Sequence, residues 1–155
     1  MNGVDEKNFA PEDAMTRAMF VTVLARLSGD TLTEQTSFSD VPAGQWYSAA
    51  VSWAAENGIV SGFGDGTFRP NDALTRAQAA VMLCAFAAFT QDDVTARADL
   101  SAYSDAGQIP SWAMDAMQWA NARRLIVGRD SSHLAPNGGA TRAEMAAILS
   151  AYIGK

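Results

Sequence analysis

An internal repeat constrains the fold of this chain more than any other feature of its sequence. Three segments align without gaps, namely NGVDEKNFAPEDAMTRAMFVTVLARL (2–27), SGFGDGTFRPNDALTRAQAAVMLCAF (61–86) and VGRDSSHLAPNGGATRAEMAAILSAY (127–152). A second pair of matching segments, 38–62 and 103–128, lies upstream of the last two copies. Repeats of this kind stack similar units on one another, because one unit alone cannot bury its apolar face. We therefore expect repeated units that pack against each other.

The upstream half of each complete repeat has the periodicity of a helix. Trp46, Ala50 and Trp53 lie at i, i+4 and i+7, which is one face at 3.6 residues per turn, and an Asn-Gly pair then ends the helix. The third repeat copies this pattern with Trp112 and Trp119. We expect Trp53 and Trp119 in the core. Trp46 and Trp112 begin their helices beside polar turns, so they are candidates for the wall of a cleft.

The downstream half is also helical, and it begins at a Thr-Arg-Ala sequence in all three copies. Thr75 with Gln78, and Thr141 with Glu144, fit a capping box, whereas the copy at Thr16 has methionine at the third helical position. The residues that follow are apolar on most faces, which is typical of helices buried among other helices. The expected fold is therefore all-α, with tandem helix-loop-helix repeats.

The repeats divide the chain into four parts. Residues 1–29 form the downstream half of repeat 1, residues 30–89 form repeat 2, residues 90–102 form a connector and residues 103–155 form repeat 3. The first repeat is incomplete, because its upstream half is missing. We expect this to leave the apolar segment AMFVTVLARL uncovered and to favour self-association.

Arg17, Arg76 and Arg142 occupy the first helical position, where the positive end of the helix dipole disfavours a cation by up to about 1 kcal/mol. Two interpretations explain three cations at such a position. Each arginine, beside unpaired backbone N–H groups, forms a receptor for a carboxylate or phosphate. Alternatively, each pairs with a nearby acid to join one repeat to the next, the candidates being Asp13, Asp40, Asp72 and Asp105. The residues alone leave both interpretations open.

The motifs of repeat 2 resemble those of the S-layer homology module. They are an F-x-D-V start, a W-x-x-x-A helix, a G-I-x-x-G-x-x-D-G-x-F-x-P loop and a T-R-A-E-like helix start, and they occur in FSDVPAGQWYSAAVSWAAENGIVSGFGDGTFRPNDALTRAQAAVML. The resemblance covers residues 38–89 and 103–155, and 2–29 as a half module. It implies a pseudo-threefold spindle with a central helical bundle. It also implies an extracellular anchor at the cell wall, in which the modules bind secondary cell-wall polysaccharide of Gram-positive bacteria.

The resemblance further implies which residues bind the polysaccharide. A pyruvate ketal on the sugar would place its carboxylate on the Thr-Arg-Ala arginine, in a groove between neighbouring modules. By position, the ligand-binding residues would be Arg17, Arg76 and Arg142, with the loop glycines Gly62, Gly64 and Gly128 and the groove walls Trp46 and Trp112. The third repeat departs from the pattern, since Asp130 replaces Gly64 and Leu134 replaces Phe68, so we expect its groove to be altered.

Other functional classes receive little support from the sequence. The net charge of -6 and the absence of a basic stripe argue against nucleic-acid binding, and no apolar run is long enough to span a membrane. The only histidine, His133, lies in a variable loop, and no nucleophile, metal or cofactor motif is present. We therefore expect a non-catalytic chain with no cofactor and no metal. The alternative to an anchor is a self-assembling surface-layer repeat protein without a sugar ligand.

Overall fold

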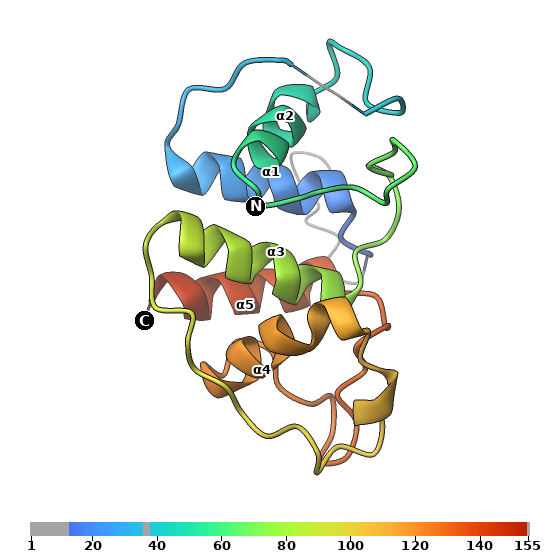
Figure 1. The fold of residues 1–155 in the computed structure, drawn as a ribbon, viewed down its shortest axis with the longest axis vertical. Coiled ribbons are helices and arrows are strands. Elements are labelled where there is room, and N and C mark those ends of the chain that lie inside the picture. Colours follow the sequence, from blue (N-terminus) through green and yellow to red (C-terminus); the bar gives the residue numbers. More distant parts are fainter. Residues whose placement is uncertain (1–12, 36–37, 155) are drawn as a thin grey trace.

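The computed structural model describes residues 13–35 and 38–154, and in these residues it is all-helical (Figure 1). This confirms the predicted all-α class. The α-helices are α1 (Arg17–Ser28), α2 (Ser48–Glu56), α3 (Arg76–Phe89), α4 (Met114–Ala122) and α5 (Arg142–Ile153). Two short 3-10 helices, η1 (Ala106–Gln108) and η2 (Ser111–Ala113), precede α4.

The helices α1, α3 and α5, here called the TRA helices, begin at the Thr-Arg-Ala sequences. In each, the hydroxyl oxygen of Thr16, Thr75 or Thr141 accepts a hydrogen bond from the backbone N–H three residues later, at 3.0 or 3.1 Å. Gln78 completes a capping box on α3, because its Oε1 accepts from the Thr75 N–H at 3.1 Å. The box predicted for α5 is wrong in its second half, since the Glu144 carboxylate contacts two arginines instead.

The helices α2 and α4, here called the Trp helices, cover the TRA helix of the preceding repeat. Helix α2 packs on α1, and α4 packs on α3. Trp53 and Trp119 are buried in these contacts, with exposed fractions of 4% and 0%, which confirms them as core residues. Trp46 lies before α2 and Trp112 lies in η2, and both are about 60% exposed. The helices α2 and α4 therefore begin after Trp46 and Trp112, and not at these residues as the sequence pattern predicted.

A ring of backbone hydrogen bonds joins the three repeats around a pseudo-threefold axis. The Met15 N–H donates to the Ala140 carbonyl at 2.9 Å, Ala140 donates to Leu74 at 2.9 Å, and Leu74 donates to Met15 at 2.8 Å. These three residues hold the same place in the repeat, two residues before each Thr-Arg-Ala arginine. Because the ring closes, the start of each TRA helix is positioned by the other two repeats.

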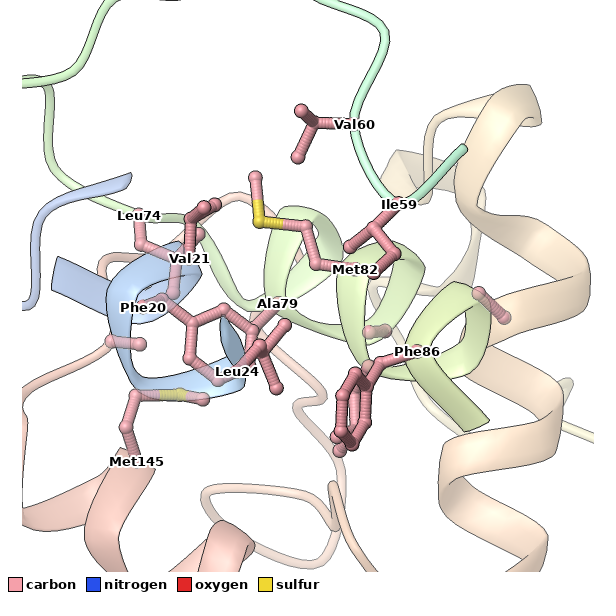
Figure 2. Packing of buried hydrophobic residues seen from close by; sticks show 14 of the residues in the cluster. Phe20, Val21, Leu24, Ile59, Val60, Leu74, Ala79, Met82, Phe86 and Met145 are labelled. Carbon is pink, nitrogen blue, oxygen red and sulfur yellow. The ribbon is translucent and has the colours of Figure 1, made fainter. Parts of the chain in front are cut away.

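The hydrophobic core lies between the TRA helices (Figure 2). Phe20 and Leu24 of α1 face Met145 of α5 and Phe86 of α3, and each of the four is at least 97% buried. Most of the segment AMFVTVLARL is therefore buried, and the prediction that it forms an uncovered surface is wrong. Helix α2 covers it, because the Trp helix of one repeat packs on the TRA helix of the repeat before.

The exposed helix surface lies on α5 instead. Ala18 of α1 and Ala77 of α3 are fully buried, but the equivalent Ala143 of α5 is exposed. Ile153, near the end of α5, is 60% exposed. Among the described residues, no helix packs on α5 as α2 packs on α1 and α4 packs on α3. None of the described helices is long and apolar enough to cross a membrane.

Candidate ligand-binding site

The backbone N–H groups at the starts of the TRA helices are already paired. The first two N–H groups of α1 donate to the carbonyls of Asp72 (3.1 Å) and Pro70 (3.0 Å), and those of α3 donate to Gly138 (2.9 Å) and Pro136 (2.8 Å). The threonine cap takes the third N–H group of each helix. The expectation of unpaired backbone donors is therefore wrong for α1 and α3, and an anion there could be held only by side chains.

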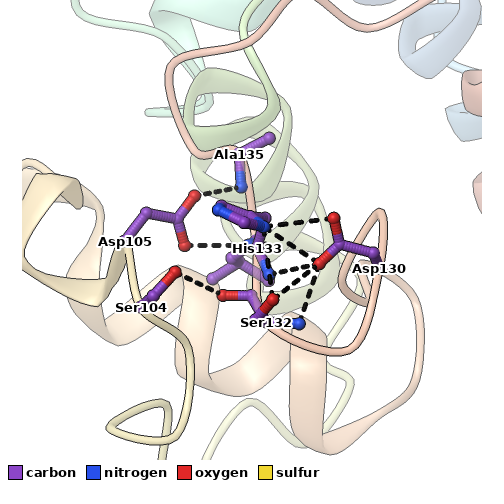
Figure 3. A network of polar contacts seen from close by, with 7 residues as sticks. Ser104, Asp105, Asp130, Ser132, His133 and Ala135 are labelled. Atoms are coloured by element: carbon purple, nitrogen blue, oxygen red, sulfur yellow. Dashed lines mark hydrogen bonds and ion pairs between the residues drawn. The ribbon is translucent and has the colours of Figure 1, made fainter.

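Asp40 and Asp105, which occupy equivalent positions in repeats 2 and 3, hold the loops whose carbonyl oxygens bind Arg17 and Arg76. Asp40 accepts hydrogen bonds from the N–H groups of Phe68 and Arg69, both at 2.8 Å. Asp105 makes the equivalent pair of bonds, at 2.9 and 2.8 Å, with the third-repeat loop (Figure 3). These bonds, led by that from the Leu134 N–H, hold the pKa of Asp105 below its usual range. Both carboxylates therefore shape the loops.

The sequence also suggested ion pairs between the arginines and nearby acids. Within residues 13–35 and 38–154, neither Arg17 nor Arg76 forms an ion pair with any of the four proposed carboxylates, Asp13, Asp40, Asp72 and Asp105. The carbonyl oxygens of Asp13 and Asp72 instead accept the N–H groups of Arg142 and Arg17. The backbone of these residues joins the repeats, and their carboxylates do not.

Arg17 is buried but keeps part of its guanidinium unpaired. Its Nε donates to the Phe68 carbonyl at 2.9 Å, and its guanidinium carbon lies 4.6 and 4.7 Å from the ring centres of Phe63 and Phe68. Its two Nη nitrogens form no hydrogen bond with the described residues. Burial is the main cause that lowers the pKa of Arg17, to about 10, so the side chain is still a cation at neutral pH.

A cavity of about 550 Å³ opens beside this guanidinium, and it is here called the Arg17 groove. Its wall is formed mainly by the second repeat, with Arg17 of α1 from the first repeat and Trp112 of η2 from the third. Most of the other side chains in the wall are apolar. The lining residues are Arg17, Gly58, Ile59, Val60, Ser61, Gly62, Phe63, Gln78, Val81, Met82, Ala85 and Trp112.

Two of the three predicted loop glycines, Gly62 and Gly128, have a packing role that the sequence did not reveal, whereas an added Cβ at Gly64 would meet no atom within 4 Å. Gly62 has a φ of 75°, and a Cβ at this position would lie 2.6 Å from Phe38 Cε1 and 2.7 Å from the Thr67 carbonyl oxygen. At Gly128 the added Cβ would lie 2.7 Å from Tyr103 Cε1. Each of these two glycines thus allows an aromatic ring of its own repeat to contact the loop backbone.

The structure brings together three of the eight predicted site residues. Arg17, Gly62 and Trp112 line the Arg17 groove, whereas Gly64 and Trp46 do not. Arg142 is buried at the start of α5, and the corresponding loop of repeat 1, residues 2–9, lies outside the described residues. The remaining two lie at the third-repeat loop. Gly128 is part of this loop, and Arg76, at the start of α3, donates to its carbonyl oxygens.

Arg76 differs from Arg17 in having a hydrogen-bond partner for each of its three guanidinium nitrogens. Its Nε donates to the Leu134 carbonyl at 3.0 Å, its Nη2 donates to the Val127 carbonyl, and its Nη1 lies 3.0 Å from Glu144 Oε2. Burial lowers the pKa of Arg76, and Glu144 opposes that shift. Glu144 also binds Arg129 Nη2 at 3.0 Å. Sequence reasoning missed this partner because it assigned Glu144 to the helix cap.

The third-repeat loop is held by a polar network around Asp130 (Figure 3). Its carboxylate accepts from the N–H groups of Ser132 and His133, both at 2.8 Å, and contacts the His133 ring at 3.0 Å. The Ser132 N–H is the largest cause of the lowered pKa of Asp130, which is about 2. His133 is exposed, as predicted for a loop residue. Among the described residues, no cluster of three or more potential ligands could hold a metal.

Comparison with known proteins agrees with this architecture. The S-layer homology domain model matches residues 37–80 and 102–146, which together are more than half of the chain. The chain belongs to the S-layer homology domain family. Domains of this family are non-catalytic anchoring modules that bind cell-wall polymers, and the family places the module at the cell surface.

Individual relatives of this S-layer homology chain include enzymes and surface proteins. It is 33% identical to an amylopullulanase of Thermoanaerobacterium thermosulfurigenes, over 96% of the chain and 8% of the relative. It is 29% identical to an endoglucanase of Bacillus sp. (strain KSM-635), over 100% and 16%. It is 31% identical to the surface-layer 125 kDa protein of Lysinibacillus sphaericus, over 94% and 12%. The chain thus spans less than a fifth of the length of each of these relatives.

Proposed function

We propose that this chain anchors a cell-surface protein by binding secondary cell-wall polysaccharide of Gram-positive bacteria in the Arg17 groove. The observation that carries the proposal is a buried arginine with unpaired Nη donors on the wall of a cavity of about 550 Å³. Burial of the Arg17 cation is costly, and the nearby carboxylates of Asp72 and Asp40 offset this cost only in part, so its free Nη donors beside a cavity favour an anionic ligand.

The chemistry of the groove suits a sugar that carries a carboxylate. The planar guanidinium can bind a carboxylate through two parallel hydrogen bonds, and the Nη nitrogens of Arg17 are the donors left for them. Because Arg17 is desolvated, each such bond is electrostatically stronger than it would be in water. Trp112, which is 60% exposed, offers an aromatic face beside the cavity. A pyruvate ketal on the polysaccharide supplies the carboxylate in this proposal.

The total charge of -6 does not oppose such a ligand strongly. Charges more than about 10 Å away are largely screened at physiological ionic strength, so the local cation dominates. Arg69, whose guanidinium carbon lies 4.0 Å from the Phe63 ring centre, adds a second positive charge near Arg17.

The experiment that tests this function is co-sedimentation with purified Gram-positive cell walls, before and after mild acid removes the ketal pyruvate. We expect binding only to the untreated walls. Arg17→Ala should weaken this binding roughly tenfold to a hundredfold, the range for a hydrogen bond to a charged group. Arg97→Ala is the matched control, because it removes the same charge from an exposed residue of the connector. Equal binding to both wall preparations would contradict a carboxylate-dependent anchor.

Two observations favour the alternative of a self-assembling repeat protein without a sugar ligand. Arg76 is used in an ion pair between repeats, as a purely structural arginine would be. Helix α5 also leaves Ala143 and Ile153 exposed, so self-association would use this surface in place of the segment on α1. Sedimentation equilibrium of the chain with Ala143→Glu tests it. If the α5 surface mediates self-association, the variant should form smaller assemblies than the wild type. An unchanged oligomeric state, together with wall binding, would contradict this alternative.

A further inference from the structure

Two Asn-Gly sequences, at Asn57 and Asn137, lie in exposed turns with matching hydrogen bonds. The side-chain Nδ2 of Asn57 donates to the Trp53 carbonyl at 2.8 Å, and that of Asn137 donates to the Gln108 carbonyl at 2.9 Å. In each turn the glycine N–H donates to the carbonyl three residues back, at 3.3 and 3.2 Å. A third Asn-Gly sequence, 2–3, lies outside the described residues. The two described turns therefore form a matched pair.

An asparagine that precedes glycine loses its amide without an enzyme, by a reaction with its own backbone. The glycine nitrogen gives up its proton, its electron pair attacks the asparagine Cγ, and a cyclic succinimide forms as the Cγ–Nδ2 bond breaks. The Nδ2 group takes up a proton and leaves as ammonia. Water then opens the succinimide at either carbonyl, which gives aspartate or isoaspartate. Because negative charge develops on the glycine nitrogen and on the amide oxygen, nearby positive charge should speed the reaction.

The two turns differ in the charge beside the glycine nitrogen. A Cβ added at Gly138 would lie 3.0 Å from Arg129 Nη1, so this Nη1 is within about 6 Å of the Gly138 nitrogen. Nη1 forms no hydrogen bond with the described residues, whereas Nη2 binds the Gly139 carbonyl and Glu144. A cation at such a separation stabilises an anion. At Gly58 an added Cβ would meet no atom within 4 Å, so no side chain is placed there in the same way.

The helix dipoles act in the same direction as Arg129. The carbonyls of Pro136 and Gly138 accept the first two N–H groups of α3, at 2.8 and 2.9 Å, so the turn at Asn137 lies at the positive end of that helix. Asn57 is the C-cap of α2, so its turn lies at the negative end of a helix. The charge that develops in the reaction is therefore favoured at Asn137 and disfavoured at Asn57.

We propose that Asn137 is a site of spontaneous deamidation, promoted by Arg129, and that isoaspartate at this position loosens the joint between repeats 2 and 3. The inference does not depend on the proposed ligand. The carboxylates of Glu144 and Asp105 offset part of the positive charge, because Glu144 binds Arg129 and Asp105 binds the Ala135 N–H. We therefore expect a moderate acceleration.

The product would alter the segment that holds the start of α3. In isoaspartate the main chain runs through Cβ and Cγ, so the path between the Pro136 and Gly138 carbonyls becomes longer by the Cβ atom. These two carbonyls accept the N–H groups of Ala77 and Arg76. The side-chain donor to the Gln108 carbonyl is also lost, and a carboxylate replaces it. Deamidation would thus weaken contacts that position α3 against the third repeat.

The test is peptide mapping by mass spectrometry of the folded chain during storage at mildly alkaline pH. The deamidated and isoaspartyl peptides that contain Asn57, Asn71 and Asn137 are quantified against time. Asn71 holds the place of Asn137 in repeat 2, but aspartate follows it, so it reports on the same turn without glycine. Storage in urea gives the rates in the unfolded chain. Wild type is compared with Arg129→Gln and with Arg129→Lys, which keeps the charge.

We expect Asn137 to deamidate about tenfold faster than Asn57 in the folded chain and at a similar rate in urea, because the difference comes from the fold. Arg129→Gln should slow the reaction at Asn137 about threefold to tenfold and leave Asn57 unchanged, whereas Arg129→Lys should keep most of the wild-type rate. Asn71 should react more slowly than Asn137. Chain with isoaspartate at 137 should unfold at lower urea than fresh chain, and stored Asn137→Gln should not change.

Two results would overturn the inference. Equal rates at Asn57 and Asn137 in the folded chain would show that the surrounding charge has no effect. A faster reaction at Asn137 in Arg129→Gln would show that the bond from Arg129 to the Gly139 carbonyl restrains the turn more than its charge activates it. An unchanged urea midpoint after isoaspartate has formed at 137 would reject the loosening of the joint.

Discussion

The surroundings of Arg17 and Arg76 share one backbone plan and differ in their charges. In both, the arginine follows a threonine cap, and its Nε donates to the carbonyl of a buried loop residue, Phe68 or Leu134. The rest of the Arg17 guanidinium lies against aromatic rings and a cavity, whereas that of Arg76 is bound by Glu144 and a carbonyl. The comparison shows that the repeat reproduces a scaffold, and that a few side chains decide whether the arginine is available.

Two substitutions between the repeats account for much of this difference. Phe63 of repeat 2 corresponds to Arg129 of repeat 3, and Gln78 corresponds to Glu144. In repeat 2 the pair is aromatic and neutral, so it forms a wall of the groove. In repeat 3 the pair carries opposite charges, so it forms an ion pair that includes Arg76.

We expect the largest loss of stability from truncation of the buried loop residues whose carbonyl oxygens bind the two arginines. Phe68 and Leu134 are both fully buried. We expect Phe68→Ala to destabilise the chain by about 3–5 kcal/mol, and Leu134→Ala by about 2–5 kcal/mol, because each leaves a cavity. Urea denaturation followed by circular dichroism measures both. Phe68→Leu, which installs the third-repeat residue, is the control and should cost less than Phe68→Ala, because it leaves a smaller cavity. A greater loss for Phe68→Leu than for Phe68→Ala would contradict the packing argument.

The second comparison removes the arginines themselves. Arg76→Ala removes one of the two arginine partners of Glu144 and leaves the Leu134 and Val127 carbonyls without this donor, so we expect a loss of about 1–3 kcal/mol in the free energy of unfolding. Arg17→Ala removes one hydrogen bond and two ring contacts, and we expect about 1 kcal/mol. Thermal unfolding of both variants, with Arg97→Ala as control, checks the order. If Arg17→Ala were the more destabilising, the unpaired state of its Nη nitrogens would be in doubt.

A third comparison uses pH on the carboxylate that holds the third-repeat loop. The folded-state pKa of Asp105 is below its usual range, so its stabilising effect is complete above the unfolded-state pKa and is lost as pH falls through the folded-state value. Asp105→Asn should therefore lower the urea midpoint at pH 7, and the difference from wild type should shrink below about pH 4. Urea titrations at pH 7 and pH 3 measure this. A difference that stays constant with pH would show that the charge of Asp105 is not involved.

The smallest expected effect concerns the exposed contact between His133 and Asp130. The pKa of Asp130 is about 2, and the Ser132 N–H contributes more to this than the His133 ring does. His133→Ala should therefore raise the pKa of Asp130 but leave it below its usual range, and at neutral pH it should lower the unfolding midpoint only slightly, because the contact is exposed. An NMR titration of the Asp130 carboxyl carbon checks it. A return to the ordinary aspartate value would show that His133, and not the backbone, holds the carboxylate.

Sequence reasoning identified the elements of the fold well, because their signals are local. The threonine caps, the Asn-Gly stop and the buried Trp53 and Trp119 depend on residues a few positions apart. It failed where the contact joins different repeats. The prediction that residues 18–27 are uncovered was wrong, because the repeat pattern does not show that α2 covers α1 rather than the TRA helix of its own repeat.

The candidate site was predicted only in part for the same reason. Arg17, Gly62 and Trp112 were identified by position in the repeat, and they meet in one cavity. The division into 1–29, 30–89, 90–102 and 103–155, and the binding roles of the eight site residues, remain predictions.

By itself, the sequence determined the five α-helices, the threonine caps of α1, α3 and α5, the repetition and the family, since each follows from local spacing or from comparison of the repeats. Only the tertiary structure decided which arginine has guanidinium donors free to bind a ligand. Glu144 lies 68 positions from Arg76, and Phe68 lies 51 positions from Arg17. A charged side chain at such a separation acquires its partner only when the repeats close around their axis. The free energy of a buried cation depends on that partner, and not on the motif that carries the arginine.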